Sequence, residues 1–169
     1  AYDINCVALR YFNVAGYDVE AGSEQIRYQP NKLIDIIIDT AHKNQTFKIN
    51  GDSHPTKDGT CVRDYVHVMD VAEANIKALN YCRDNKNFEI FNIGSGIPTS
   101  NLEVINEVQR HLGKINTEIG DARKEVSHSL ADITKAKEIL DWEPAQSSID
   151  KVVASAVKWY NMTHKKELQ

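Results

Sequence analysis

The sequence predicts an α/β fold, and three features point to it. Strand-like and helix-like segments alternate along most of the 169 residues, as in chains built from βα units. The apolar run from Cys6 to Leu9 is typical of a strand buried on both faces of a parallel sheet. Ser100 and Glu103 have the spacing of a capping box ahead of a helical pattern. A chain of this length can form one domain with its own core.

Composition excludes several classes of function. The net charge is −4 and the isoelectric point about 5.9, so no broad cationic surface is expected to attract nucleic acid or a membrane. The three cysteines, Cys6, Cys61 and Cys82, form no CxxC pair. Neither a disulfide framework nor a metal site is therefore predicted, and a cytoplasmic location is expected. No apolar run reaches the length of a membrane span, and the first residues lack the features of a signal peptide.

The first part of the chain is expected to contain a strand, a loop and a helix. Residues 5–12 form the strand, and the few residues before it cannot supply a neighbouring strand. An open edge is therefore expected, which favours self-association or a homodimer. Residues 13–29 are rich in glycine and polar side chains and predict a loop. Pro30 suits the first position of a helix that runs to about His42 with an apolar stripe of leucine and isoleucine.

The middle of the chain is expected to centre on residues 62–68, where β-branched and aromatic side chains predict a strand. A short strand at 47–50 and a polar turn at 51–59 lead to it. Asp70 has the position of a capping residue, so a helix is expected to begin there and to end before Asn85. The core face of this helix is expected to carry Ala72, Ile76 and Leu79.

The last part alternates short strands with helices, whose ends are marked by Gly113 and by the Trp-Glu-Pro sequence at 142–144. The expected elements are a strand at 89–93, a helix from Ser100 to Gly113, a short strand at 115–119, an irregular stretch at 120–129, a helix at 133–140, a last helix capped by Ser147 or Ser148, and a frayed tail from His164.

The stretch at 62–70 is more polar than a buried strand needs to be. It carries Arg63, Asp64, Tyr65 and His67 within a few residues. One interpretation is an edge strand with one face in water, and the other is a strand that contributes to a ligand site. Composition alone does not separate these two.

Three stretches of sequence carry a resemblance to a known family. They are LRYFNVAG at 9–16, PTKDGTCVRDYVHVMD at 55–70 and FNIGSG at 91–96. In this order and spacing they resemble the UDP-glucose 4-epimerases, members of the extended short-chain dehydrogenase group. The middle stretch is the most specific, since the other two recur in related dehydratases and decarboxylases.

The resemblance implies an enzyme that interconverts UDP-glucose and UDP-galactose with NAD as its cofactor. Bound NAD takes a hydride from C4 of the sugar while a tyrosine removes the hydroxyl proton, and the 4-keto sugar turns over before the hydride returns. The UDP stays anchored meanwhile. An arginine suits the anchor, because its planar guanidinium pairs with diphosphate oxygens and keeps its proton.

The resemblance also implies that this chain is the C-terminal half of such an enzyme. It would hold a substrate-binding α/β lobe together with the last strands and a helix of a Rossmann-type sheet. Residues 1–16 and 69–96 are assigned to the cofactor part, and 17–68 with 97–169 to the UDP-sugar lobe. The glycine-rich phosphate turn and the catalytic Tyr-x-x-x-Lys of the family are then expected upstream of Ala1.

Site residues are carried over from matching positions one at a time. Phe12 resembles the aromatic residue that lies against the nicotinamide, and Tyr11 beside it is also assigned to the cofactor. Asn13 and Arg63 resemble residues that bind the substrate diphosphate. The ordinary alternatives are a core aromatic, a turn asparagine and a surface ion pair of Arg63 with Asp64. The other positions assigned to the substrate are Asn31, Lys32, Leu33, Lys48, Ile49, Asn50, Arg123, Glu125 and Ser129.

Some of these positions depart from the family pattern. Ser129 is small where the family limits the room beside the sugar, so UDP-GlcNAc is a further substrate to test. The other departures are Lys32 in place of Asn or His, Asp35 in place of proline, Asn50 in place of an aromatic residue, and Arg123 with Glu125 in place of Arg-x-Gly-Asp.

No catalytic residue is predicted in this chain. Tyr28 and Lys32 have the Tyr-x-x-x-Lys spacing, but Pro30 between them is expected to start the helix and leave Tyr28 outside it. The leading hypothesis is a UDP-hexose 4-epimerase fragment that carries the UDP-sugar anchor and is inactive alone. Two alternatives stay open. One is a non-catalytic nucleotide-sugar-binding or vestigial protein, and the other is another extended short-chain enzyme, such as a dehydratase or decarboxylase.

Overall fold

Strands and helices alternate in the computed structural model, which describes residues 4–21, 30–85 and 88–164. In chain order the elements are β1 (Cys6–Tyr11), β2 (Asn13–Ala15), α1 (Leu33–His42), β3 (Phe47–Ile49), β4 (Val62–His67), α2 (Val68–Asp84), β5 (Phe88–Ile93), β6 (Pro98–Ser100), α3 (Asn101–Leu112), β7 (Thr117–Ile119), β8 (His128–Ser129), α4 (Thr134–Leu140) and α5 (Ile149–His164). The α/β class predicted from the sequence is confirmed.

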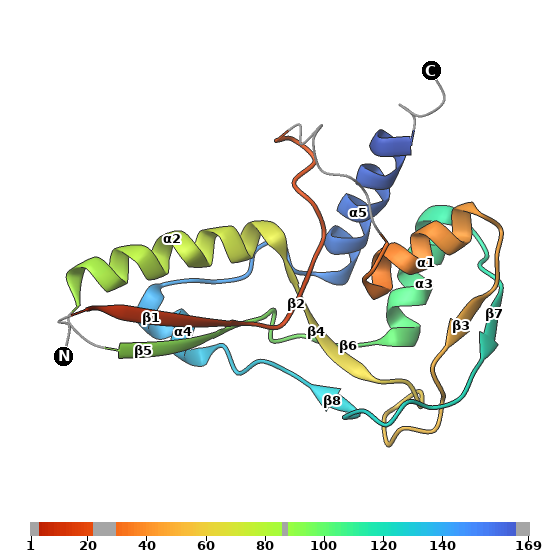
Figure 1. Ribbon diagram of the computed structural model, residues 1–169, viewed down its shortest axis with the longest axis horizontal. Coiled ribbons are helices and arrows are strands. Elements are labelled where there is room, and N and C mark those ends of the chain that lie inside the picture. The colour runs from red at the N-terminus through yellow and green to blue at the C-terminus, as the bar shows by residue number, and fades with distance from the viewer. Residues whose placement is uncertain (1–3, 22–29, 86–87, 165–169) are drawn as a thin grey trace.

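β4 is the strand that joins the parts of the fold (Figure 1). Its second half pairs in parallel with β2, where Asn13 lies opposite Tyr65. Its first half pairs with antiparallel β6 and parallel β8, so that Arg63 lies opposite both Thr99 and Ser129. Two further parallel pairs, β1 with β5 and β3 with β7, lie at opposite ends of the molecule. Residues that the sequence separates widely therefore meet around β4.

Two hydrophobic clusters form the core. The first unites α1, α3 and α5 with β3, and the second unites α2, α4 and β5 with the buried Trp142. Successive side chains of a strand point to opposite faces, so Tyr65 of β4 belongs to the first cluster and Val66 to the second. β4 thus lies between the two clusters and contributes to both.

β1 is less buried than its apolar sequence suggests. It pairs with β5 along its whole length, and within the described part of the chain no second strand pairs with it. Its residues are half-buried or exposed, so the prediction of a strand buried on both faces is wrong here. The physical reason is that one strand and one helix, α2, cover β1. The expected open edge is present in the described structure.

The buried stripe of α2 also differs from the predicted one. Ile76 and Leu79 are 63% and 71% exposed, and Ala72 is exposed as well. Both possible stripes have helical spacing, so periodicity alone could not choose between them. Small side chains face the strands because they let the helix approach closely. The apolar residues that α2 buries are Val71, Ala74 and Ala78.

Asp70 does not cap α2, contrary to the prediction. The helix begins earlier, and the side chain of His67 accepts the capping hydrogen bond. Asp70 is only 2% exposed, and its carboxylate accepts hydrogen bonds from the backbone N–H groups of Ala145 and Gln146 and from the Ser147 hydroxyl. It therefore ties α2 to the segment that leads into α5.

Other boundaries also differ from the prediction, and the unpredicted strands β6 and β8 form because both pair with β4. α1 begins after Pro30, because the extended N-cap residue is Lys32. β2 occupies the start of the predicted loop, since it pairs with β4. His164 does not fray, because its ring stacks on Tyr160 with the centroids 3.8 Å apart.

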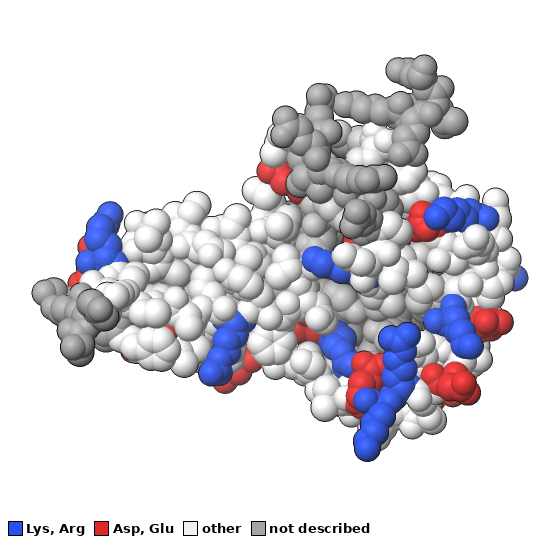
Figure 2. All heavy atoms as spheres, viewed as in Figure 1, with Lys and Arg blue, Asp and Glu red and all other residues white. Residues whose placement is uncertain are grey.

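The surface drawn in Figure 2 mixes acidic and basic side chains and shows no broad cationic face. Of the helices in 4–21, 30–85 and 88–164, none is long and apolar enough to cross a membrane. The predictions that concern residues 22–29, Tyr28 among them, and 165–169 lie outside the described residues.

Replacing Ser100 by alanine is expected to destabilise the chain by about 1 kcal/mol, the usual contribution of an N-cap. The Ser100 hydroxyl accepts from the Glu103 N–H at 3.1 Å, and the Glu103 carboxylate accepts from the Ser100 N–H at 2.8 Å. The predicted capping box is thus confirmed. Urea unfolding followed by circular dichroism measures the loss, with the exposed Ser53→Ala as control. Equal unfolding midpoints for Ser100→Ala and wild type would contradict the prediction.

Candidate functional site

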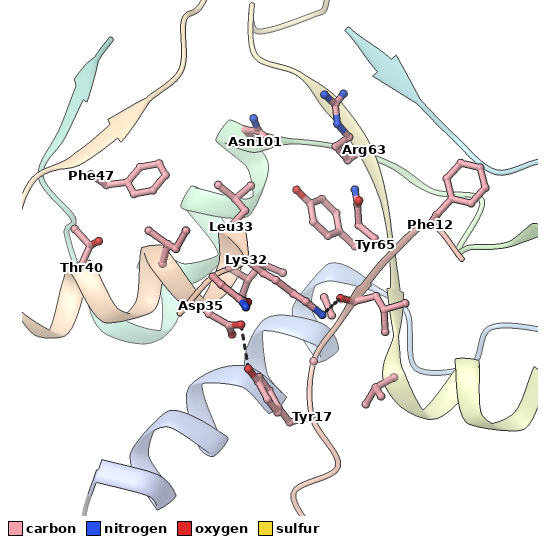
Figure 3. A pocket seen from close by; sticks show the side chains of 18 of the residues that line it. Phe12, Tyr17, Lys32, Leu33, Asp35, Thr40, Phe47, Arg63, Tyr65 and Asn101 are labelled. Atoms are coloured by element: carbon pink, nitrogen blue, oxygen red, sulfur yellow. Dashed lines mark hydrogen bonds between the residues drawn. The ribbon is translucent and has the colours of Figure 1, made fainter. Parts of the chain in front are cut away.

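One large cavity lies among β2, β4, the start of α1 and β3, with a volume of about 1270 Å³. Figure 3 shows Arg63 and Tyr65 on one side, Lys32 and Leu33 on another, and Phe12 at the margin. The cavity brings together most of the site residues predicted from the sequence. Those that line it are Phe12, Asn13, Asn31, Lys32, Leu33, Lys48, Asn50, Arg63, Arg123 and Glu125.

Three predicted site residues do not line the cavity. The Tyr11 hydroxyl donates to Asn75 of α2 at 2.8 Å, and the residue is 47% exposed on β1. Ile49 is buried in the first cluster. Ser129 lies on β8 beside Arg63. Their roles toward cofactor and substrate stay predictions.

Two contacts within the chain hold the Arg63 side chain in place. Its Nη2 lies 2.6 Å from Oε2 of Glu125, and its Nη1 donates to the Val62 carbonyl at 2.9 Å. The ion pair predicted as an alternative role for Arg63 was with Asp64, but the structure pairs Arg63 with Glu125 instead. Only 15% of the Arg63 side chain is exposed, so its charge acts in a partly desolvated place where hydrogen bonds to ions are strong.

Asp64 fixes the strand that carries Arg63. Its buried carboxylate accepts hydrogen bonds from the N–H groups of Ser95, Gly96 and Ala131, at 2.5, 3.0 and 3.1 Å, and from the Ser95 hydroxyl at 2.8 Å. These donors lie after β5 and before α4. Asp64 therefore has a structural role, because it joins β4 to the segment after β5 and the segment before α4.

The cavity wall is suited to an anion. Two lysines and two arginines line it, together with the amide of Asn13. The Lys32 ammonium reaches across to the Val14 carbonyl of β2 at 3.1 Å (Figure 3). Three acids offset part of this charge, namely Glu125 through its pair with Arg63, and Asp18 and Asp35 elsewhere in the lining. Cationic donors and an amide at one surface are groups that bind phosphate oxygens. The four cations are Lys32, Lys48, Arg63 and Arg123.

A contact among Tyr17, Asp35 and Trp159, two of which line the cavity, was not predicted from the sequence. The Tyr17 ring stacks on Trp159 of α5, with centroids 5.1 Å apart, and its hydroxyl donates to Asp35 of α1 at 3.0 Å. Burial raises the pKa of the Asp35 carboxyl. In the sequence Asp35 is only a departure from a family proline, and no spacing rule connects it to Tyr17 and Trp159.

Acid is expected to destabilise the chain through His67. Burial lowers the pKa of His67 below 6.5, and its imidazole caps α2 as an acceptor, a role that needs the unprotonated nitrogen. The unfolded chain therefore takes up this proton first, so the stability present above about pH 6.5 is lost as the pH falls. Urea unfolding between about pH 7.5 and pH 5 should give a flatter profile for His67→Gln than for wild type. The exposed His128→Gln should keep the wild-type slope, and identical slopes for all three would contradict the prediction.

Comparisons of sequence connect this chain to known proteins. Residues 1–94 match the model of the NAD dependent epimerase/dehydratase family. The chain is 40% identical to the UDP-glucose 4-epimerase of Lacticaseibacillus casei over 163 residues, and 38% identical to that of Streptococcus mutans over 164 residues. Each match covers 95% of this chain and 49% of the relative. The chain thus spans about half the length of the curated relatives it matches.

Solved structures agree with the sequence match. A UDP-glucose-4-epimerase from Stenotrophomonas maltophila, with bound NAD and formylated UDP-arabinopyranose, is 30% identical with a TM-score of 0.90, over 98% of this chain and 50% of that one. The UDP-glucose 4-epimerase from Bifidobacterium longum, in complex with NAD+ and UDP, is 30% identical with a TM-score of 0.82, over 94% and 48%. The family model alone covers more than half of the 169 residues. The chain therefore belongs to the NAD dependent epimerase/dehydratase family.

Proposed function

We propose that this chain supplies the UDP-sugar anchor of a UDP-hexose 4-epimerase. The observation that carries the proposal is the meeting of Asn13 and Arg63 in one cavity, although fifty positions separate them in the sequence. The register of β2 on β4 places Asn13 opposite Tyr65, next but one to Arg63. An amide and a guanidinium in one cavity can bind the oxygens of one diphosphate.

The other cavity residues extend this anchor. Arg123 and Lys32 add positive charge for the diphosphate, and Asn31 and Leu33 stand at the start of α1 beside them. The strand β3 offers Lys48 and its backbone to the uracil, as the family resemblance implies, with Asn50 and Ile49 next to it. Glu125 is assigned to the ribose and Ser129 to the room beside the sugar, with UDP-GlcNAc as a further substrate. Holding UDP while leaving the sugar free is the task of these residues in the proposed reaction.

We also propose how the chain divides between cofactor and substrate. Residues 1–16 and 69–96 form the part nearest the cofactor, with β1, β5 and α2 as its main elements. Residues 17–68 and 97–169 form the UDP-sugar lobe, which holds the cavity. The packing of α4 against β5 fastens the second part to the first.

The residues of this chain do not fit a whole NAD by themselves. No glycines in the sequence have the spacing of a dinucleotide phosphate turn. The closest glycine pair, Gly94 and Gly96, follows β5, but a Cβ at Gly94 would meet Asp64 and Ala131 at 2.6 and 2.5 Å. This glycine serves contacts within the chain and leaves no cradle for phosphate. Phe12, which lines the cavity, is the residue that we assign to the nicotinamide side.

The purified chain with added NAD is expected not to convert UDP-galactose to UDP-glucose, yet to bind UDP. The reason is that its Tyr-x-x-x-Lys spacing is limited to Tyr28 and Lys32, and Lys32 holds a backbone carbonyl. A coupled assay for UDP-glucose and calorimetry with UDP test both parts. Turnover would overturn the predicted inactivity, and an absence of UDP binding would overturn the anchor itself.

The two alternative functions predict different results in the same experiments. UDP binding without turnover, even after addition of an epimerase segment that carries the phosphate turn and catalytic pair, would favour a non-catalytic nucleotide-sugar-binding or vestigial protein. Release of a dehydrated or decarboxylated sugar would favour another extended short-chain enzyme. The middle sequence stretch at 55–70 favours the epimerase.

A further inference from the structure

A cluster of metal-ligating side chains lies beside Arg63. Only one of its three residues, Glu125, is also assigned to the substrate. A ring nitrogen of His54, the thiol of Cys61 and a carboxylate oxygen of Glu125 all lie within 4.8 Å of one another. They come from the turn before β4, the residue preceding β4, and the segment between β7 and β8. The sequence predicts no metal site because Glu125 is far along the chain from His54 and Cys61 and no CxxC pair is present.

His54 provides the observation that distinguishes this cluster from an ordinary polar contact. Its Nε2 is buried and has no hydrogen-bond partner among the described residues. Buried polar atoms are almost always paired, so an unpaired imidazole nitrogen calls for a ligand. Cys61, at 2% exposure, is buried next to it. Imidazole nitrogen, thiolate sulfur and carboxylate oxygen together form a donor set typical of Zn²⁺.

We propose that His54, Cys61 and Glu125 bind one Zn²⁺, with a water molecule as the fourth ligand. The thiol of Cys61 gives up its proton to solvent when the sulfur–metal bond forms, and no oxidation is involved. Glu125 uses Oε2 for Arg63 and has a second oxygen to offer the metal, so the metal and the ribose assigned to Glu125 compete for that oxygen. The Arg63 guanidinium is a competing cation for the Glu125 carboxylate, and it contacts only one of the two carboxylate oxygens.

Cobalt and zinc titrations of the purified, reduced chain test this site. One Co²⁺ per chain is expected, with a thiolate-to-metal charge-transfer band in the near ultraviolet that Zn²⁺ displaces. Cys61→Ser should lose the band. His54→Gln and Glu125→Gln should weaken metal binding by about tenfold or more, because each removes one protein ligand.

Matched controls separate this site from adventitious binding. Cys82→Ser and His111→Gln, which change a cysteine and a histidine elsewhere in the fold, should bind metal as the wild type does. Circular dichroism checks that each variant is folded. If Cys61→Ser does not fold, the metal affinity of His54→Gln tests the site instead. No charge-transfer band in the wild type, or full-strength binding in His54→Gln, would overturn the proposal. The readout is independent of UDP, so failure of the metal site leaves the proposed UDP anchor standing.

Discussion

Replacing Arg63 by alanine is expected to weaken UDP binding by about tenfold to a hundredfold. A hydrogen bond to a charged group contributes about 1.5–3 kcal/mol, and each 1.4 kcal/mol corresponds to about a factor of ten. The Arg63 side chain is 15% exposed, so its guanidinium acts in a place that water screens poorly. Calorimetric titration with UDP measures the change, and the wild-type affinity should itself fall as salt is added.

Two substitutions give this experiment its controls. Arg63→Lys keeps the charge but loses the two-pronged geometry, so an intermediate affinity is expected. Arg110→Ala removes an arginine whose partner is Glu107 on α3, away from the cavity-lining residues, and should leave UDP binding unchanged. Equal heats for wild type and Arg63→Ala would remove Arg63 from the site.

Features that depend on a single short segment could be predicted from the sequence. The capping box at Ser100 needs only residues within one helical turn, and it forms as predicted. The stripe of α2 was misassigned because two stripes share the helical period, and the approach of other elements selects the one with small side chains. Asp70 was misassigned for a related reason, since its partners at 145–147 lie far along the chain.

In the candidate site, too, short motifs could be predicted from the sequence and contacts between distant segments could not. Residues such as Asn13 and Arg63 could be proposed from short motifs, and the cavity does contain both. The partners of those residues could not be predicted, because the Arg63–Glu125 pair joins β4 to a segment with no regular pattern. The Tyr17–Asp35 bond and the stack on Trp159 depend on the packing of α1 against α5, which no spacing rule describes.

Replacing Asp64 by alanine is expected to reduce the free energy of unfolding by about 3–5 kcal/mol, a large share of the stability of a single domain. The carboxylate accepts from three backbone N–H groups, those of Ser95, Gly96 and Ala131. Alanine leaves all three buried N–H donors without an acceptor. Each unpaired donor costs about 1–3 kcal/mol, and the cost is smaller for a donor that can hydrogen-bond to water instead. The segments after β5 and before α4 then lose the contact that joins them to β4.

Urea unfolding of Asp64→Ala and Asp64→Asn distinguishes this network from a simple loss of charge. Asparagine keeps one acceptor oxygen but turns an amide N–H₂ toward backbone donors, so it should rescue little of the stability. The exposed loop variant Asp121→Asn removes the same charge without a network and should unfold at the wild-type midpoint. Should Asp64→Asn match the wild type, the four hydrogen bonds would not be what holds these segments together. Because Asp64 adjoins Arg63 on β4, its loss should also weaken UDP binding in any variant that stays folded, and the same calorimetric titration would detect it.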